Sequence, residues 1–277
     1  IDATGDGDLA FQAGCSYEFG HPETGLTQPM SLIALITGVS HEKIRCFNNT
    51  LEYEGRSAKE LLREYMEQHG IYTSYGSPSL FHVQDDLYIL MINHEYGYSG
   101  LKAEDITKAT LHARAELHNV INSLRETGEL WKNIRIVATA EQIGVREGRR
   151  IKGHYYLTED DLLQGRKHED AVSHVTFNFD VHSTNPEKEK SIEKRKEKAK
   201  PYDIPLRALI AKDVDGLLLA GRCISGDFLA HSSYRVTGNA VSMGEAAGKV
   251  AAYSCKNNKL PQQLSVEEVK QIMLGEG

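Results

Sequence analysis

The stretch that decides the fold is Gly216-Leu-Leu-Leu-Ala-Gly-Arg-Cys-Ile-Ser-Gly-Asp-Phe-Leu-Ala-His-Ser-Ser-Tyr-Arg-Val-Thr-Gly238. It begins with the apolar run Leu217–Ala220, which stops at Gly221, as is typical of a strand covered on both faces of a parallel sheet. A loop rich in hydrogen-bond donors follows, and the chain then continues to residue 252 largely in Gly, Ala and Ser. The stretch therefore predicts a buried strand, a loop and a closely approaching helix.

The amino end of the predicted helix is suited to an electron-rich oxygen. The first N–H groups of a helix have no partner within it and carry partial positive charge. We therefore expect Gly238, Asn239 and Ala240 to face an anion or a polar ligand. A tightly packed helix after a capping loop would use the same residues without any ligand. The two arginines and the histidine of the preceding loop favour the ligand-binding interpretation.

Three short segments, in this stretch and just after it, resemble the closing segment of the FAD-dependent oxidoreductases of the glutathione-reductase-like superfamily. They are residues 217–225, 230–236 and 243–248. The resemblance is closest to the bacterial FAD dependent oxidoreductase family, whose relatives include the flavoproteins of fumarate reductase and heterodisulfide reductase. It implies that FAD is the cofactor and that this segment lies along its ribityl chain and isoalloxazine ring. A helix amino end there would stabilise the negative charge of reduced flavin.

The first residues of the chain also resemble the family. Ala3-Thr4-Gly5 is similar to the turn that lies beside the pyrophosphate and adenosine of FAD, although Asp8 in the first turn is equally typical of an ordinary helix start. The G-x-G-x-x-G turn of a dinucleotide site does not occur in the 277 residues. We therefore expect the chain to be the carboxy-terminal part of a longer flavoprotein, with about half of the nucleotide-binding domain located before Ile1.

An arginine cluster follows a predicted strand in the middle of the chain. The cluster lies in the motif Gly-x-Arg-Glu-x-Arg-Arg-Ile, which ends at Ile151. This motif is typical of the family, where it lies at the junction between the cap and the FAD domain. Guanidinium groups either bind a substrate carboxylate bidentately or close a domain interface through ion pairs. Both roles stay open for Arg149 and Arg150.

Other polar residues are candidates through the resemblance. His182 matches an Asp-x-His word of the family and could exchange protons, or it is a hydrogen-bonded structural histidine. Gly226-Asp227-Phe228 departs from the family pattern, so Asp227 could instead bind the ribityl hydroxyls. Tyr202 or Arg207 could line the substrate side.

The candidate site residues form two groups. The candidates for substrate binding and proton transfer are Arg149, Arg150, His231 and Arg235. The candidates for FAD binding are Thr4, Gly5, Gly221, Arg222, Ser225, Asp227, Gly238, Asn239 and Ala240.

The segment between the two ends has elements of its own. Apolar periodicity and turn residues predict helices over residues 57–70 and 104–127 and strands over 31–38, 87–93 and 134–140. With the resemblance, the expected fold class is α/β: a partial, Rossmann-like FAD-binding domain with an inserted α+β cap or substrate domain. The expected boundaries are 1–29 for the first part of the FAD-binding domain, 30–180 for the cap, and 181–277 for the return to the FAD-binding domain and the C-terminal helices.

Composition and residue spacing argue against several other classes of protein. The net charge of −7 argues against a nucleic-acid partner, and no apolar run is long enough to span a membrane. The four cysteines are far apart, which fits free thiols in a reducing compartment and a cytoplasmic location. The histidines show no metal-ligand spacing, so we expect no metal site. A homo-oligomer stays open.

The sequence thus predicts an FAD-dependent oxidoreductase that transfers hydride between flavin and a small polar or anionic substrate. One alternative is an inactive fragment or an interaction subunit that needs a separate nucleotide-binding half. Another is an electron-transfer flavoprotein of the heterodisulfide-reductase type, with its iron–sulfur cluster outside this chain. The encoded sequence before Ile1 distinguishes these hypotheses most directly.

Overall fold

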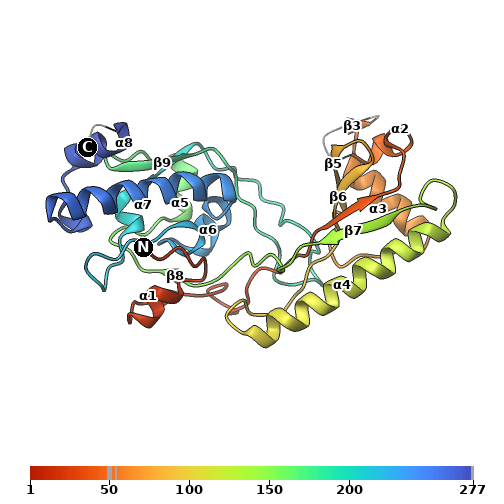
Figure 1. Cartoon of the computed structure of the whole chain (residues 1–277), viewed down its shortest axis with the longest axis horizontal. Helices are drawn as coiled ribbons and strands as arrows, with labels where there is room; N and C mark the ends of the chain where they lie inside the picture. Colours follow the sequence, from red (N-terminus) through yellow and green to blue (C-terminus); the bar gives the residue numbers. More distant parts are fainter. Residues whose placement is uncertain (49–51, 54, 276–277) are drawn as a thin grey trace. The chain divides into compact units, whose positions relative to one another are not determined.

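The computed structural model describes residues 1–48, 52–53 and 55–275, which form two compact units (Figure 1). Unit 1 consists of Ile1–Thr27, Arg146–Val181 and Lys194–Gly277, and unit 2 consists of Gln28–Val145 and His182–Glu193. The expected cap, residues 30–180, has a different boundary from unit 2. Arg146–Val181 belongs to unit 1, because two strands in this segment pair with strands of that unit, and His182–Glu193, expected in the FAD-binding domain, belongs to unit 2.

Unit 2 is built around a four-stranded antiparallel sheet. The order is β5-β6-β2-β7, formed by Ser79–Gln84, Leu87–Met91, Ala34–Thr37 and Arg135–Thr139. The helices α3 (Ala58–Gln68) and α4 (Ala103–Glu126) share one hydrophobic core with this sheet. The remaining described elements of the unit are α2 (His41–Ile44), η1 (Arg45–Phe47), β3 (Glu52–Tyr53) and β4 (Arg56–Ser57).

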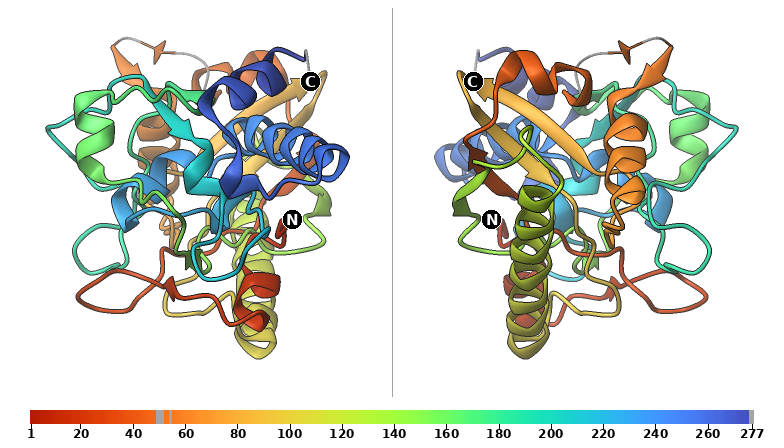
Figure 2. Two further views of the ribbon diagram at one scale, coloured as in Figure 1. Left: turned by 90° about the vertical axis from the view of Figure 1, so that its left-hand side faces the viewer. Right: turned by 90° about the vertical axis from the view of Figure 1, so that its right-hand side faces the viewer.

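The periodicity of the sequence accounts for both long helices of unit 2. A capping box between Ser57 and Glu60 starts α3, since each satisfies a backbone N–H group of the other. Figure 2 shows α4 as one unbroken helix. Its buried residues recur every three or four positions and are Ala109, Ala113, Leu117, Val120, Ile121 and Leu124. Both predicted helices and the strands predicted at β2, β6 and β7 are confirmed, with ends that shift by a few residues, whereas β5 was not predicted.

Unit 1 combines short paired strands with helices. Its strands are β1 (Tyr17–Glu18) paired with β8 (Arg150–Ile151), and β9 (Ala171–Val175) paired with β10 (Tyr202–Pro205). Both pairs are antiparallel. The other elements of unit 1 are α1 (Asp8–Gln12), α5 (Glu159–Gln164), η2 (Leu206–Leu209), η3 (Gly221–Cys223), α6 (Phe228–Tyr234), α7 (Thr237–Asn257), η4 (Pro261–Gln263) and α8 (Val266–Leu274).

The buried strand expected at Leu217–Ala220 does not form a ladder. Its backbone makes single bridges, parallel between Leu219 and Asp2 and antiparallel between Leu218 and Ile210. Gly216 and Gly221, both with positive φ, turn the chain at either side of the four residues and keep the run short. Among the described residues the named ladders are all antiparallel. The structure therefore shows a mixed α/β protein with small antiparallel sheets.

The segment expected to be a loop before the small-residue helix contains a helix of its own. α6 covers Phe228–Tyr234, and Asp227 caps it by accepting a hydrogen bond from the Ala230 N–H. The predicted helix after it is confirmed as α7, and the expected C-terminal helices end with α8. α7 places Met243, Ala246, Ala247 and Val250 in the core of unit 1. None of the helices in the described ranges has the length and hydrophobicity needed to cross a membrane.

Candidate functional site

The turn at the start of the chain is held by a buried carboxylate. Asp2 is fully buried, and its Oδ1 accepts hydrogen bonds from Thr4 N–H (3.0 Å) and the Thr4 hydroxyl (2.7 Å). Its Oδ2 accepts one from Ala10 N–H at 2.8 Å. Gly5 follows with φ of 80°, a conformation that glycine adopts without strain. The turn that contains Thr4 and Gly5 is therefore rigid.

Two arginines contact the loop that follows this turn. Arg222 donates to the Asp6 carboxylate at 2.9 Å, and its guanidinium covers Gly5 so closely that a Cβ there would lie 2.7 Å from Nη1. Arg149 donates to the Asp6 carbonyl (3.0 Å) and the Asp8 carboxylate (2.8 Å). The structure thus brings three predicted site residues, Gly5, Arg149 and Arg222, to one loop.

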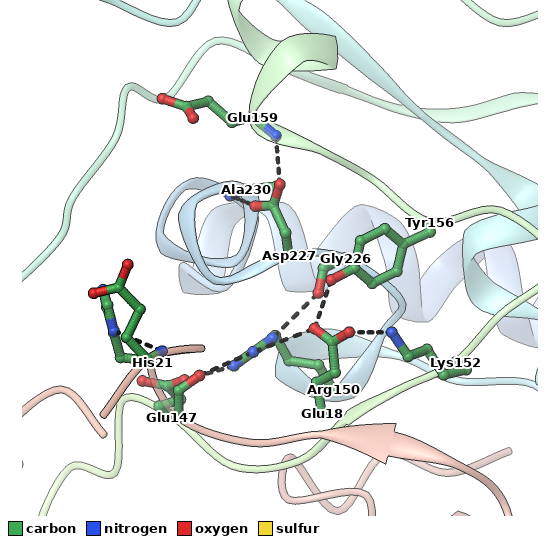
Figure 3. Close-up of polar contacts among 12 residues, drawn as sticks. Glu18, His21, Glu147, Arg150, Lys152, Tyr156, Glu159, Gly226, Asp227 and Ala230 are labelled. Carbon is green, nitrogen blue, oxygen red and sulfur yellow. Dashed lines mark hydrogen bonds and ion pairs between the residues drawn. The ribbon is translucent and has the colours of Figure 1, made fainter. Parts of the chain in front are cut away.

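Arg150 forms a buried ion pair instead of facing an open site (Figure 3). Its Nη1 lies 2.6 Å from Glu147 Oε1, and the two side chains are 2% and 0% exposed. Its Nε donates to the Gly226 carbonyl (3.2 Å) and its Nη2 to the Gly20 carbonyl (3.1 Å). Each nitrogen of the guanidinium already has a protein acceptor, so this arginine ties together three separate stretches of unit 1.

A partly exposed carboxylate extends the network around Arg150. Glu18 accepts hydrogen bonds from Lys152 and from the Tyr156 hydroxyl, and its Oε2 lies 3.7 Å from Arg150 Nη2 (Figure 3). Burial opposes the ionisation of Glu18, but the hydrogen bonds from Lys152 and Tyr156 outweigh it and hold its pKa below the ordinary value. The carboxylate is therefore charged at neutral pH.

Asp227 has a structural task that the sequence did not indicate. Its Oδ1 accepts from Ala230 N–H and its Oδ2 from Glu159 N–H, both at 2.7 Å. It thereby caps α6 and joins it to the start of α5, as Figure 3 shows. Its predicted role toward the ribityl hydroxyls stays a prediction.

His231 is a neutral imidazole in a cationic environment. It is fully buried, and neither ring nitrogen has a hydrogen-bond partner in the part of the chain that the structure describes. Burial lowers its pKa most, and the positive charges of Arg235, Arg150 and Arg222 lower it further, against a weaker opposite effect of the Arg222 backbone. The ring is therefore neutral at physiological pH, so one of its nitrogens can donate a hydrogen bond and the other can accept one.

Arg235 is also held in place. Its guanidinium donates to the Asp180 carbonyl at 2.7 Å and lies 3.3 Å from the Asp180 carboxylate. The side chain is 6% exposed, and burial lowers the pKa of the guanidinium while Asp180 and Glu147 raise it. Arg235 thus carries its charge in a position fixed by unit 1 itself.

The amino end of α7 has the properties expected of a polar-ligand contact. Its N-cap residue, Val236, supplies no side-chain cap. The N–H groups of Asn239 and Ala240 bond to the Val236 carbonyl, whereas no hydrogen bond of Gly238 N–H occurs among the described residues. A Cβ at Gly238 would meet no atom within 4 Å. Nearby in sequence, the Ser225 hydroxyl is buried without a partner in the described structure.

These donors fit the cofactor that the resemblance implies. An electron-rich flavin oxygen needs N–H or O–H donors and positive charge. The Gly238 N–H, the Ser225 hydroxyl and Arg222 Nε are such donors, and none of the three has a hydrogen-bond partner in the described structure. Gly221 has φ of 83° and turns the chain between the apolar run and these residues.

Some predicted residues lie elsewhere. His182 belongs to unit 2, where its Nδ1 is 3.0 Å from His94 Nε2. Tyr202 is buried and donates to the Ser233 hydroxyl, and Arg207 pairs with Asp170. Their roles toward a substrate stay predictions.

The carboxylates that position the arginines were missed. Glu147, Asp6 and Asp180 each pair with a candidate arginine. The i, i+3 spacing of Glu147 and Arg150 was a usable signal for one of these pairs, because it suits a local ion pair. The other two pairs join positions far apart in the sequence, and no local pattern marks them.

The ion pair of Arg150 should be essential for the stability of unit 1. Arg150→Met leaves Glu147 charged and buried, and we expect a loss of about 3–5 kcal/mol in the free energy of unfolding. The double variant Arg150→Met with Glu147→Gln should recover part of the loss. Arg63→Met, at an exposed pair with Glu67, should cost less than about 1 kcal/mol. Urea unfolding of the wild-type protein and the three variants measures these changes. Equal losses of unfolding free energy for Arg150→Met and Arg63→Met would contradict the assignment.

His231 should stay neutral through the physiological range. Its pKa in the folded state lies below the value of about 6.5 that a histidine has in an unfolded chain. As the pH falls, the imidazole of the unfolded state is therefore protonated before that of the folded state. Folding stability therefore decreases on acidification below about pH 6.5. NMR of the ring nitrogens should show no titration of His231 between about pH 6 and 8, with free histidine in the sample as the titrating reference. A midpoint for His231 near that of free histidine would refute this expectation.

Comparison with known proteins tests the resemblance. The family profile described as FAD dependent oxidoreductase matches residues 1–273, nearly the whole chain. Neither the curated proteins nor the solved structures provide a match. The resemblance to this family, and with it the expectation of an FAD-dependent enzyme, is confirmed. The chain belongs to the FAD dependent oxidoreductase family and is a flavoprotein with oxidoreductase activity and FAD as its cofactor.

Proposed function

We propose that the enzyme transfers hydride between FAD and a small anionic substrate, and that unit 1 supplies the flavin-facing part of the site. The observation that carries the proposal is the electrostatics at His231. Burial lowers the pKa of this imidazole most, and the charges of Arg235, Arg150 and Arg222 lower it further, so three guanidinium groups lie around it. A carboxylate-bearing substrate is the chemical class that guanidinium groups favour.

The proposal assigns FAD binding to three short segments. The Thr4–Gly5 turn would lie along the pyrophosphate and adenosine, as in the family that the sequence resembles. The Gly221–Ser225 segment and the amino end of α7 would face the ribityl chain and the ring. FAD itself supplies the hydride chemistry when bound. Gly238 N–H and the Ser225 hydroxyl would donate hydrogen bonds to electron-rich oxygens, since neither has a partner in the described structure.

The arginines divide into two functional groups in this proposal. Arg150 positions the loop before α6, because its nitrogens already have protein acceptors. Arg235 and the neutral His231 would bind the substrate, the arginine through charge and the imidazole through a hydrogen bond. Arg149 would hold the Asp6–Asp8 loop, with which it already makes two contacts.

The finer architecture also belongs to the proposal. The chain would be the carboxy-terminal part of a Rossmann-like flavoprotein of the glutathione-reductase-like superfamily. The parallel bridge between Asp2 and Leu219 supports this view, because parallel pairing of distant segments is typical of nucleotide-binding sheets.

Titration of the FAD-loaded protein with small dicarboxylates tests the proposed substrate class. Malonate should perturb the visible flavin spectrum saturably, and malonamide, which has the same shape without the charge, should not. Arg235→Gln should weaken the malonate response at least about tenfold, because one charge-assisted hydrogen bond is lost. Arg63→Gln is the control for a surface arginine.

Two results would contradict the proposal. The first is an equal response to malonate and malonamide. The second is an unchanged malonate affinity in an Arg235→Gln protein that still holds FAD. Absence of any flavin binding by the complete protein would instead favour an inactive or interaction subunit.

A further inference from the structure

Asp2 joins three parts of unit 1: the apolar run Leu217–Ala220, the Thr4–Gly5 turn and the start of α1. Its backbone lies against the apolar run. Asp2 N–H donates to the Leu218 carbonyl at 2.7 Å, and Ala220 N–H donates to the Asp2 carbonyl at 2.9 Å. Leu218 and Ala220 are buried in the core of unit 1. The core therefore sets the position from which the Asp2 side chain reaches the turn.

Both oxygens of this side chain act as acceptors. Oδ1 accepts from the N–H group and the hydroxyl of Thr4, and Oδ2 accepts from Ala10 N–H. An ionised carboxylate accepts at both oxygens, whereas an asparagine amide has only one acceptor oxygen. An amide at this position would turn its NH₂ group toward a backbone N–H group. The arrangement therefore requires a carboxylate.

The same contacts replace the side-chain cap that α1 lacks. The N-cap residue of α1 is Gly7, which has no side chain to accept a hydrogen bond. Instead, Asp2 Oδ2 accepts from Ala10 N–H at 2.8 Å, and the Thr4 hydroxyl oxygen accepts from Asp8 N–H at 2.9 Å. Asp2 thus fixes the turn together with the first residues after it.

The donors that the turn can offer to a ligand are backbone groups. The single hydroxyl proton of Thr4 is used in the hydrogen bond to Asp2. The N–H groups of Gly5, Asp6 and Gly7 make no hydrogen bond with any residue that the structure describes. Gly5 and Gly7 have φ of 80° and 66°, and successive N–H groups in turns of this kind converge on anions. Their direction depends on the turn that Asp2 holds.

We propose that Asp2 is a positioning residue for FAD, whose carboxylate holds the Thr4–Gly5 turn in the shape that receives the diphosphate. The inference rests on the part of the proposed function that lays FAD along this turn. Asp2 is fully buried and acts on the cofactor only through the turn. The Thr4 hydroxyl then supports FAD binding through its bond to Asp2 and makes no bond of its own to the cofactor.

FAD titration of the apoprotein tests the role of the carboxylate. Asp2→Asn keeps the size of the side chain but leaves one backbone N–H group facing the amide NH₂. It should raise the dissociation constant of FAD at least about tenfold. Asp213→Asn is the matched control, because Asp213 is exposed and also accepts from a backbone N–H group and a hydroxyl, both of Ser16. This control should bind FAD as the wild-type protein does.

Competition by ADP distinguishes a local effect from a general loss of structure. ADP contains the adenosine and the diphosphate of FAD but lacks the isoalloxazine ring. Asp2→Asn should weaken ADP by the same factor as FAD, and FAD bound to this variant at saturation should keep its wild-type visible spectrum. An altered spectrum together with an unchanged affinity for ADP would show that the change acts at the ring, which contradicts the inference.

The Thr4 hydroxyl provides a second test, which does not require Asp2→Asn to fold. Thr4→Val has nearly the same shape without the hydroxyl and should weaken FAD about three- to tenfold. Thr4→Ser keeps the hydroxyl and should restore nearly wild-type affinity. If Thr4 acts through Asp2, the double variant Asp2→Asn with Thr4→Val should lose less affinity than the product of the two single losses.

Three further results would overturn the inference. They are wild-type FAD affinity in a folded Asp2→Asn protein, an equal loss of affinity in Asp213→Asn, and equal FAD affinities of Thr4→Val and Thr4→Ser. The malonate titration reports separately on the proposed substrate class. A protein that binds FAD in an Asp2-dependent way but does not respond to malonate would contradict that class and support the role of Asp2.

Discussion

The arrangement of unit 1 depends on the buried ion pair between Arg150 and Glu147. Removing two charges from water is costly, and the pair is tolerable only because the backbone carbonyls of Gly20 and Gly226 complete the hydrogen bonding of the guanidinium. Those carbonyls come from the turn after β1 and from the loop before α6. One side chain therefore fixes the position of the loop that leads to His231, Arg235 and the amino end of α7.

The arginines around His231 are held without a bound anion, because carboxylates of the same unit pair with them. Arg222 pairs with Asp6, and Arg235 pairs with Asp180. His231 stays neutral because it is fully buried, and the nearby arginine charges lower its pKa further. The site thus combines charged groups, whose positions are set by ion pairs, with uncharged donors that have no partner in the described structure. Such preorganised donors stabilise charge as it develops, with little rearrangement.

Local sequence signals predicted the helices well and the pairing of the chain poorly. The apolar spacing of α4 and the small residues of α7 lie within each element, so the sequence alone reveals them. Leu217–Ala220 has the composition of a buried strand, but its partners, Asp2 and Ile210, are set by tertiary structure. Asp227 shows the same limit: the sequence offered a polar residue in a loop, and the structure uses it to cap a helix that lacked a recognised signal.

The proposed function requires that the loop bearing Arg222 faces FAD and that its positive charge stabilises the reduced flavin. The two-electron midpoint potential of bound FAD measures this directly. Arg222→Gln should shift the potential to more negative values by about 30 mV or more, the equivalent of a tenfold change for two electrons, and Asp6→Asn should shift it in the opposite direction. An unchanged potential in an Arg222→Gln protein that retains its FAD would contradict the claim.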